Sequence, residues 1–276
     1  MTYTNLVVNL RLRQSNEAVL RITRHLAQRL AAGVTGFCVC RPIDMVCGAY
    51  SVPPPIYAED RRQIARDVGV AEAEFRTALQ PAVDRLAWRH WTTTAPLAND
   101  IAGESRAADL LVTALPREGT AFDSTRDVAA IDLVMQAGRP VLLVPGVAAA
   151  TAFDHVVVGW KEGREARRAI VDAMPLLSLA RRVTLVAVAA DQAVVLAESQ
   201  VAEVVAWLKH HRIAVEPMVV AARGAHGRQF MEIARKITAD LIVVGACAYL
   251  RHGQWVLGGV TAELLQRSDR CVLLSN

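Results

Sequence analysis

The chain of 276 residues is long enough for one large domain or for two domains of ordinary size. Apolar residues make up 53% of it and charged residues 21%, which favours a substantial core and excludes a disordered chain. The net charge of +4 is not gathered into a basic stripe, and the Arg-Arg pairs at 61–62, 167–168 and 181–182 fit solvated helix faces, so we expect no nucleic-acid partner.

Neither a membrane span nor an export signal is expected. No window reaches 18 uninterrupted apolar residues, and the short apolar stretch near the start is followed by arginines. We therefore expect a cytoplasmic protein without a membrane partner. The five cysteines are an odd number in no zinc-like spacing, which predicts no metal site and small buried thiols in a reduced compartment. They are Cys38, Cys40, Cys47, Cys247 and Cys271.

The first half alternates strands and helices. Ser15 suits the start of an amphipathic helix whose inner side is lined by Leu20, Leu26 and Leu30. A proline-containing stretch after Cys40 predicts a long loop. The expected strands are 5–10, 34–40, 88–94, 109–114 and 140–145, and the expected helices are 15–32, 59–86, a short helix after 94, and 126–137.

The second half repeats this alternation. The expected strands are 155–160, 183–189, 213–220, 241–245 and 271–275, and the expected helices are 164–180, 191–211, 227–238 and 259–267. The run Leu241–Val244 has no period-2 alternation, which is typical of a strand that is covered on both faces.

The two halves are copies of one another. AADLLVTA at 107–114 resembles TADLIVVGA at 238–246, and RPVLLV at 139–144 resembles RCVLLS at 270–275. Asp109 and Asp240 are 131 residues apart, as are Arg139 and Arg270. We predict a duplicated domain, with one copy at 1–147 and the other at 153–276.

Strands that are separated by helices imply parallel pairing, and hence an α/β fold of two tandem doubly wound domains, each with its own five-stranded parallel sheet flanked by helices. Ligands of such sheets bind beyond the carboxyl ends of the strands, where the winding reverses. This rule directs attention to residues 159–163, 188–191 and 245–260.

The last of these regions has the pattern of a phosphate-binding loop. Gly245 ends a strand, and Gly258 and Gly259 precede a helix. Free backbone N–H groups and the helix dipole suit a phosphate at such a place. Turn geometry alone explains two glycines equally well.

The same loop resembles the nucleotide loop of the universal stress protein family, which reads Gly, two residues, Gly, nine residues, Gly, then Ser or Thr. Gly245 and Gly258 keep the spacing, whereas Ala248 replaces the second glycine and Gly259 replaces the hydroxyl residue. The family's Asp at the end of the first strand, which faces the adenosine part of the nucleotide, is Lys161 here. An ammonium donates hydrogen bonds only, so Lys161 would meet a phosphate or remain solvated.

The resemblance implies a universal stress protein fold, of the adenine nucleotide alpha-hydrolase-like type, and a site for ATP or ADP in the second half only. Thr261 offers a hydroxyl that could replace the one lost at Gly259. Trp160 is expected as core or crevice wall. The residues that we expect at the site are Trp160, Lys161, Val188, Gly245, Ala248, Arg251, Gly258, Gly259, Val260 and Thr261.

The first half lacks the loop. Gly119 is its single glycine there, and Glu118, Asp123 and Asp127 would repel phosphate. We expect this copy to be degenerate. The resemblance also implies that the two last strands pair within the chain as in a homodimer, and a homodimer of whole chains remains an open alternative.

We therefore predict a tandem universal stress protein, a non-catalytic stress-response module that binds an adenine nucleotide in its second domain. The alternative is a nucleotide-free dimerising scaffold. A slow ATPase would need a metal-binding or water-positioning residue near Gly258, for which the sequence offers no candidate. A flavin or dinucleotide carrier is disfavoured because no G-x-G-x-x-G follows either first strand.

Overall fold

The computed structural model describes residues 2–43, 46–47, 50–51, 53–115, 123, 125–146, 152–246, 248–251 and 254–276. The first half contributes five strands to the main sheet: β1 (Asn5–Asn9), β2 (Gly33–Cys40), β5 (Leu86–Thr92), β6 (Leu110–Ala114) and β7 (Val141–Val144). The second half contributes β8 (His155–Gly159), β9 (Arg182–Ala189), β10 (Val215–Ala221), β11 (Leu241–Gly245) and β14 (Cys271–Ser275).

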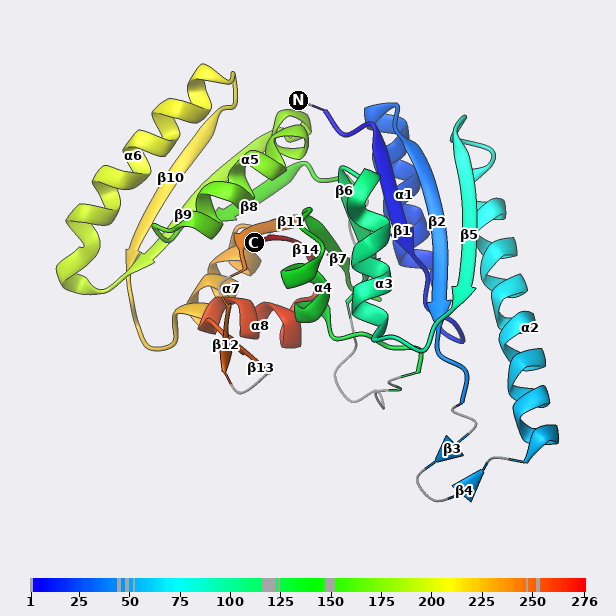
Figure 1. Ribbon diagram of the computed structural model, residues 1–276. Helices are drawn as coiled ribbons and strands as arrows, with labels where there is room; N and C mark the ends of the chain where they lie inside the picture. Colours follow the sequence, from blue (N-terminus) through cyan, green and yellow to red (C-terminus); the bar gives the residue numbers. More distant parts are fainter. Residues whose placement is uncertain are drawn as a thin grey trace.

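All ten strands form one sheet, in the order β10-β9-β8-β11-β14-β7-β6-β1-β2-β5 (Figure 1). If the strands of each half are counted along the chain, both halves have the order 3-2-1-4-5, and all pairs within a half are parallel. The halves meet where β14 pairs antiparallel with β7. The expected pairing of the last strands is confirmed, and the duplication is visible in the strand order. The expectation of two separate sheets is wrong, because this pairing satisfies both edges in one continuous sheet.

Helices cover both faces of the sheet. One face carries α1 (Glu17–Leu30), α2 (Pro54–Leu79), α5 (Arg164–Leu179) and α6 (Val194–His210). The other carries α3 (Leu97–Glu104), α4 (Ala130–Gln136), α7 (His226–Lys236) and α8 (Gly259–Arg267). Two 3₁₀ turns, η1 (Ser105–Ala107) and η2 (Asp191–Ala193), complete the helical elements of the described residues.

The central strands are buried on both faces, as their unbroken apolar sequences predict. Leu241 and Val243 pack into the core under α1 and α5, whereas Ile242 and Val244 pack into the core under α4, α7 and α8. Each of these cores contains residues from both halves of the chain. The two copies are therefore units of duplication that share their cores across the β7–β14 seam.

An aspartate fixes the start of the first strand in each half. The Asp109 carboxylate accepts hydrogen bonds from the N–H groups of Thr4 and Asn5, at 2.7 and 2.9 Å. The Asp240 carboxylate accepts one from the N–H of His155, at 2.9 Å. The same hydrogen bond from a backbone N–H group to an aspartate therefore occurs at the start of the first strand in both copies of the repeat.

Several boundaries differ from those predicted. Helix α2 begins five residues earlier than expected, because Pro54 and Pro55 occupy its first turn, where a missing N–H costs nothing. The N-cap of α1 is Asn16, and the Ser15 hydroxyl accepts a hydrogen bond from the N–H of Glu17 at 3.4 Å. Two antiparallel strand pairs lie where loops were expected: β3 (Val46–Cys47) with β4 (Tyr50–Ser51), and β12 (Ala248–Arg251) with β13 (Gln254–Leu257).

Candidate functional site

The winding of the second half reverses between β8 and β11, which are neighbours in the sheet. The chain leaves β8 into α5 on one face, and it leaves β11 through the β12–β13 hairpin into α8 on the other. In Figure 1 the hairpin projects beyond α7 and α8, away from the sheet. This arrangement is the crevice in which doubly wound folds bind their ligands.

The amino end of α8 supplies backbone donors to this crevice. Gly258 is the N-cap residue, and the first intrahelical bond that follows it runs from the N–H of Ala262 to the Gly258 carbonyl, at 3.0 Å. No side chain caps this end in the described part of the chain. The N–H groups of Gly259, Val260 and Thr261 consequently have no acceptor inside the helix, and the helix dipole makes this end attractive to an anion.

Gly245 is a glycine because of close packing. A Cβ on Gly245 would lie 2.4 Å from the carbonyl carbon of Glu165 and 2.6 Å from the nitrogen of Ala166, in the first turn of α5. Gly245 is not among the described residues with positive φ. The absence of a side chain at Gly245 lets the amino end of α5 lie against the tip of β11.

Gly227 makes a second close approach that the sequence analysis did not identify. A Cβ there would lie 2.5 Å from the carbonyl oxygen of Gly259, so the start of α7 touches the start of α8. By contrast, a Cβ on Gly259 would meet no atom within 4 Å. The sequence offered only a glycine at the first position of the predicted helix 227–238, which does not by itself indicate a close approach.

Ala248 carries no backbone strain. It lies in β12, where it pairs with Leu257, and it is not among the described residues with positive φ. Replacing the second glycine of the loop is therefore compatible with the backbone that this chain adopts. Arg251 lies at the end of the same strand, opposite Gln254. Cys247 and His252, which fall between Gly245 and Gly258 in the sequence, lie outside the described residues.

The remaining predicted residues differ in their access to the crevice. Lys161, two residues after the end of β8, is exposed. Trp160 is buried, and its indole N–H has no hydrogen-bond partner in the described structure. Val188 and Val260 are half-buried and pack against the core that contains α7 and α8. Thr261 is 2% exposed and shares the buried side of α8 with Leu264, so its hydroxyl does not face solvent in place of the one lost at Gly259.

Cationic side chains stand at this end of the second half. Lys161 follows β8, and Arg223 and Arg228 flank the start of α7; all three are exposed. None of the three forms an ion pair within the described residues, although sixteen other arginines of the described residues do, such as Arg182 with Glu216 at 2.6 Å. Positive charge without a carboxylate partner favours an anionic ligand.

The corresponding crevice of the first half is filled by the protein itself. The Arg11 guanidinium pairs with the Asp127 carboxylate, and their side chains are only 12% and 5% exposed. Gln14 donates to the same carboxylate at 3.3 Å. Arg126 pairs with Asp60 at 3.4 Å and with Asp123 at 3.3 Å. Arg11 is the partner of Asp127 that could not be predicted from the sequence, and the pair neutralises the Asp127 charge. Glu118 and Gly119 lie outside the described residues.

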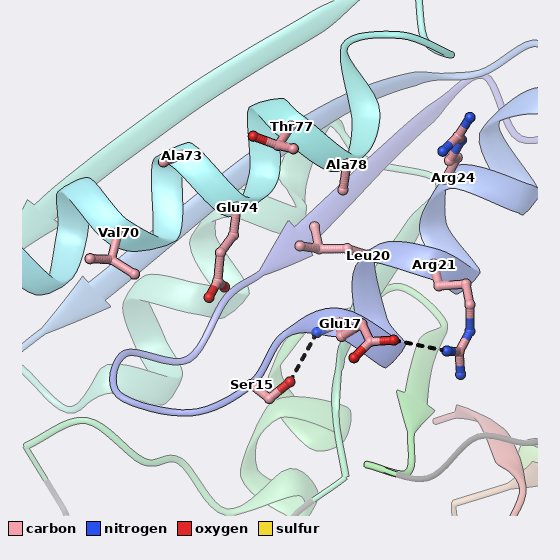
Figure 2. Close-up of a pocket in the computed structure, with 10 residues that line it drawn as sticks. All are labelled: Ser15, Glu17, Leu20, Arg21, Arg24, Val70, Ala73, Glu74, Thr77 and Ala78. Atoms are coloured by element: carbon pink, nitrogen blue, oxygen red, sulfur yellow. Dashed lines mark hydrogen bonds and ion pairs between the residues drawn. The ribbon is translucent and has the colours of Figure 1, made fainter.

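A larger cavity, of about 710 Å³, opens between α1 and α2 on the outside of the first half (Figure 2). Its floor is Leu20, and Val70 and Ala73 of α2 face it. Glu17 forms an ion pair with Arg21 at 3.3 Å along one wall. The cavity is lined by apolar side chains and by charged side chains of both signs. None of its lining residues belongs to the predicted site.

The three cysteines whose side chains the structure describes are buried thiols of low reactivity. Cys38, Cys40 and Cys271 are buried and free, as expected. Burial raises the pKa of Cys38 to about 12, and likewise that of Cys271.

No three His, Cys, Asp or Glu side chains of the described residues come together as a metal site would require. None of the described helices combines the length and the apolar character that a membrane crossing needs.

No family model matches the sequence, and no curated protein matches it. Solved structures match along the whole chain. A universal stress protein from Archaeoglobus fulgidus DSM 4304 gives a TM-score of 0.73 at 14% identity, covering 99% of this chain and 98% of its own. A functionally unknown protein from Pseudomonas aeruginosa PAO1 gives a TM-score of 0.60 at 13% identity, and the match covers 99% of this chain and 92% of that protein. The chain therefore has the tandem α/β fold of the universal stress protein structures, as its sequence resemblance predicts.

Proposed function

We propose that this protein is a tandem stress-response module that binds an adenine nucleotide, ATP or ADP, in its second half and catalyses no reaction. The halves correspond to residues 1–147 and 153–276. The observation that carries the proposal is the contrast between the crevices. Arg11 and Asp127 fill the first, whereas the second joins the amino end of α8 to cations without ion-pair partners.

The backbone does most of the binding in this proposal. The N–H groups of Gly259, Val260 and Thr261 hold the phosphates, with the helix dipole behind them. Lys161 adds a positive charge next to the phosphates. Because an ammonium group only donates hydrogen bonds, Lys161 does not accept one from a ribose hydroxyl. Val188 and the β12–β13 hairpin, with Ala248 and Arg251, flank the base and sugar. Gly245 and Gly258 position the backbone segments that carry the phosphate-binding N–H groups and the residues of the hairpin.

The test uses the whole chain, because the cores are shared between the halves. Calorimetric titration of ATP and ADP into protein purified without ligand should give a saturable heat. Gly259→Pro removes one phosphate-binding N–H at the first helical position, where proline is well tolerated. Gly258 has ψ 149°, which suits a residue that precedes proline. Gly259→Ala is the matched control, since its Cβ meets nothing within 4 Å and its N–H remains.

We expect Gly259→Pro to weaken nucleotide binding by roughly tenfold or more, the value of one charge-assisted hydrogen bond, and Gly259→Ala to leave it near wild type. Equal affinities for the two variants would contradict the proposed phosphate site. A whole chain that gives neither heat nor a thermal shift with any adenine nucleotide would leave the nucleotide-free scaffold as the function. Phosphate release above the buffer control would show that the protein is an enzyme.

A further inference from the structure

The outer side of the second half carries an apolar groove that the nucleotide proposal does not use. It lies between α6 and the edge strand β10 and has a volume of about 460 Å³. Val201 and Val205 form its buried floor, and Pro217 and Val219 form the β10 side. Val195, at the start of α6, is 78% exposed. Apolar surface of this kind on a helix is typical of an interaction site.

The edge of β10 cannot accept another strand along its length. The N–H of Ala222 donates to the Ala189 carbonyl of β9, and the ladder is regular and parallel, so the even-numbered residues of β10 bond inward and the odd-numbered ones face outward. Pro217 is one of the outward-facing residues and has no N–H to offer. A partner at this edge must therefore use the groove and the helix beside it.

The charges along the α6 side of the groove are self-complementary. Glu198 stands near one end and Lys209 near the other, about 16 Å apart along the helix axis. Their side chains form no ion pair within the described residues. Between them lie Ala202 and Ala206, whose small side chains permit close approach of a second helix.

We propose that two copies of this chain associate about a two-fold axis, with each α6 lying antiparallel in the groove of the other. A pair centred between Glu203 and Val204 brings Glu198 of each copy beside Lys209 of the other, and it brings Ala202 and Ala206 to the crossing point. An isologous interface requires this self-complementarity, since every contact occurs twice. The interface is separate from the β7–β14 seam within the chain and from the nucleotide crevice.

The test is the oligomeric state of the full chain, measured by sedimentation velocity and light scattering across a micromolar dilution series. Wild type should dimerise. Glu198→Lys and Lys209→Glu each replace two attractive contacts by two repulsive ones, and each should raise the dimer Kd by roughly tenfold or more. The control is Glu203→Lys, because Glu203 is exposed and lies about 140° around the helix from Glu198. It should leave the Kd near wild type.

The double variant Glu198→Lys with Lys209→Glu restores both pairs and should dimerise again. An equimolar mixture of the two single variants should form a mixed dimer. A wild-type chain that stays monomeric throughout would overturn the proposal. So would a dimer that the single reversals leave intact, or single-variant monomers that neither the double variant nor the mixture restores. Circular dichroism of each variant separates loss of association from loss of folding.

Discussion

Gly227 at the start of α7 lies against the carbonyl oxygen of Gly259 at the start of α8, so closely that a Cβ on Gly227 would come within 2.5 Å of that oxygen. The two helices therefore hold each other in position at the crevice of the second half. The geometry of the proposed phosphate site depends on a residue that offers a ligand no side chain.

We expect Gly227→Ala to displace the amino end of α8 and to destabilise the protein by about 1–3 kcal/mol, as overpacking of a well-filled site does. Its free energy of unfolding from urea denaturation should fall, and nucleotide affinity should fall with it. Gly259→Ala, which adds the same methyl group at the other residue of the contact but into open space, should leave the free energy of unfolding near wild type. If both variants were equally stable, the close approach would have no energetic consequence.

Gly259→Ser should strengthen nucleotide binding. The variant restores a hydroxyl at the position where the resembled loop has Ser or Thr, and the space around this position is open. One additional neutral hydrogen bond to a phosphate oxygen corresponds to about 0.5–1.5 kcal/mol, or a two- to twelvefold lower Kd. Calorimetry against Gly259→Ala separates the hydroxyl from the added carbon. An unchanged Kd would mean that no phosphate oxygen reaches this position.

Asp127→Asn should destabilise the first half strongly. The substitution leaves the nearly buried Arg11 guanidinium without its carboxylate, which typically costs about 3–5 kcal/mol. Asp123→Asn is the matched control in the same cluster, because the Asp123 side chain is 48% exposed. Urea denaturation should show a large loss of stability for the first variant and a small one for the second. Comparable losses would mean that the Arg11 pair contributes no more than a surface pair.

His155 makes the stability depend on pH. Burial lowers the pKa of His155, helped by the Arg182 charge, below its ordinary value of 6.5. The neutral ring lies 2.9 Å from the Thr184 hydroxyl. Because the unfolded chain then binds the proton more tightly, this contribution is complete above pH 6.5 and is lost as the pH falls toward the folded pKa.

His155→Asn places in the second half the residue that the first half has at Asn5. We expect the wild type to lose more stability than this variant between pH 7 and pH 5, as measured by urea denaturation at each pH. Parallel pH profiles for the two proteins would contradict the lowered pKa.

The strands and the duplication could be predicted from the sequence because they depend on local pattern. The run from Leu241 to Val244 is apolar without alternation, and it forms a strand buried on both faces. The repeated aspartates Asp109 and Asp240 mark the same position in both halves of the structure. Helix α8 begins and ends at the predicted residues, since Gly258 precedes it and the next strand follows closely.

What the sequence could not provide is contact between distant residues. The close packing at Gly245 could not be predicted because its neighbour, the backbone at Glu165, lies 80 positions earlier in the chain. Arg11 and Asp127 are 116 positions apart, so their pairing was not visible either. The merging of the two sheets depends on edges that only a folded chain brings together.

The antiparallel β7–β14 seam has a further consequence because both strands belong to one polypeptide. Two separate chains joined in this way would be identical on either side and would fall apart on dilution. Here the joining is unimolecular, and it does not depend on protein concentration. Covalent fusion also lets each copy change alone, so the Arg11–Asp127 pair of the first half needs no counterpart in the second, where Lys161 and Gly258 stand at the matching positions.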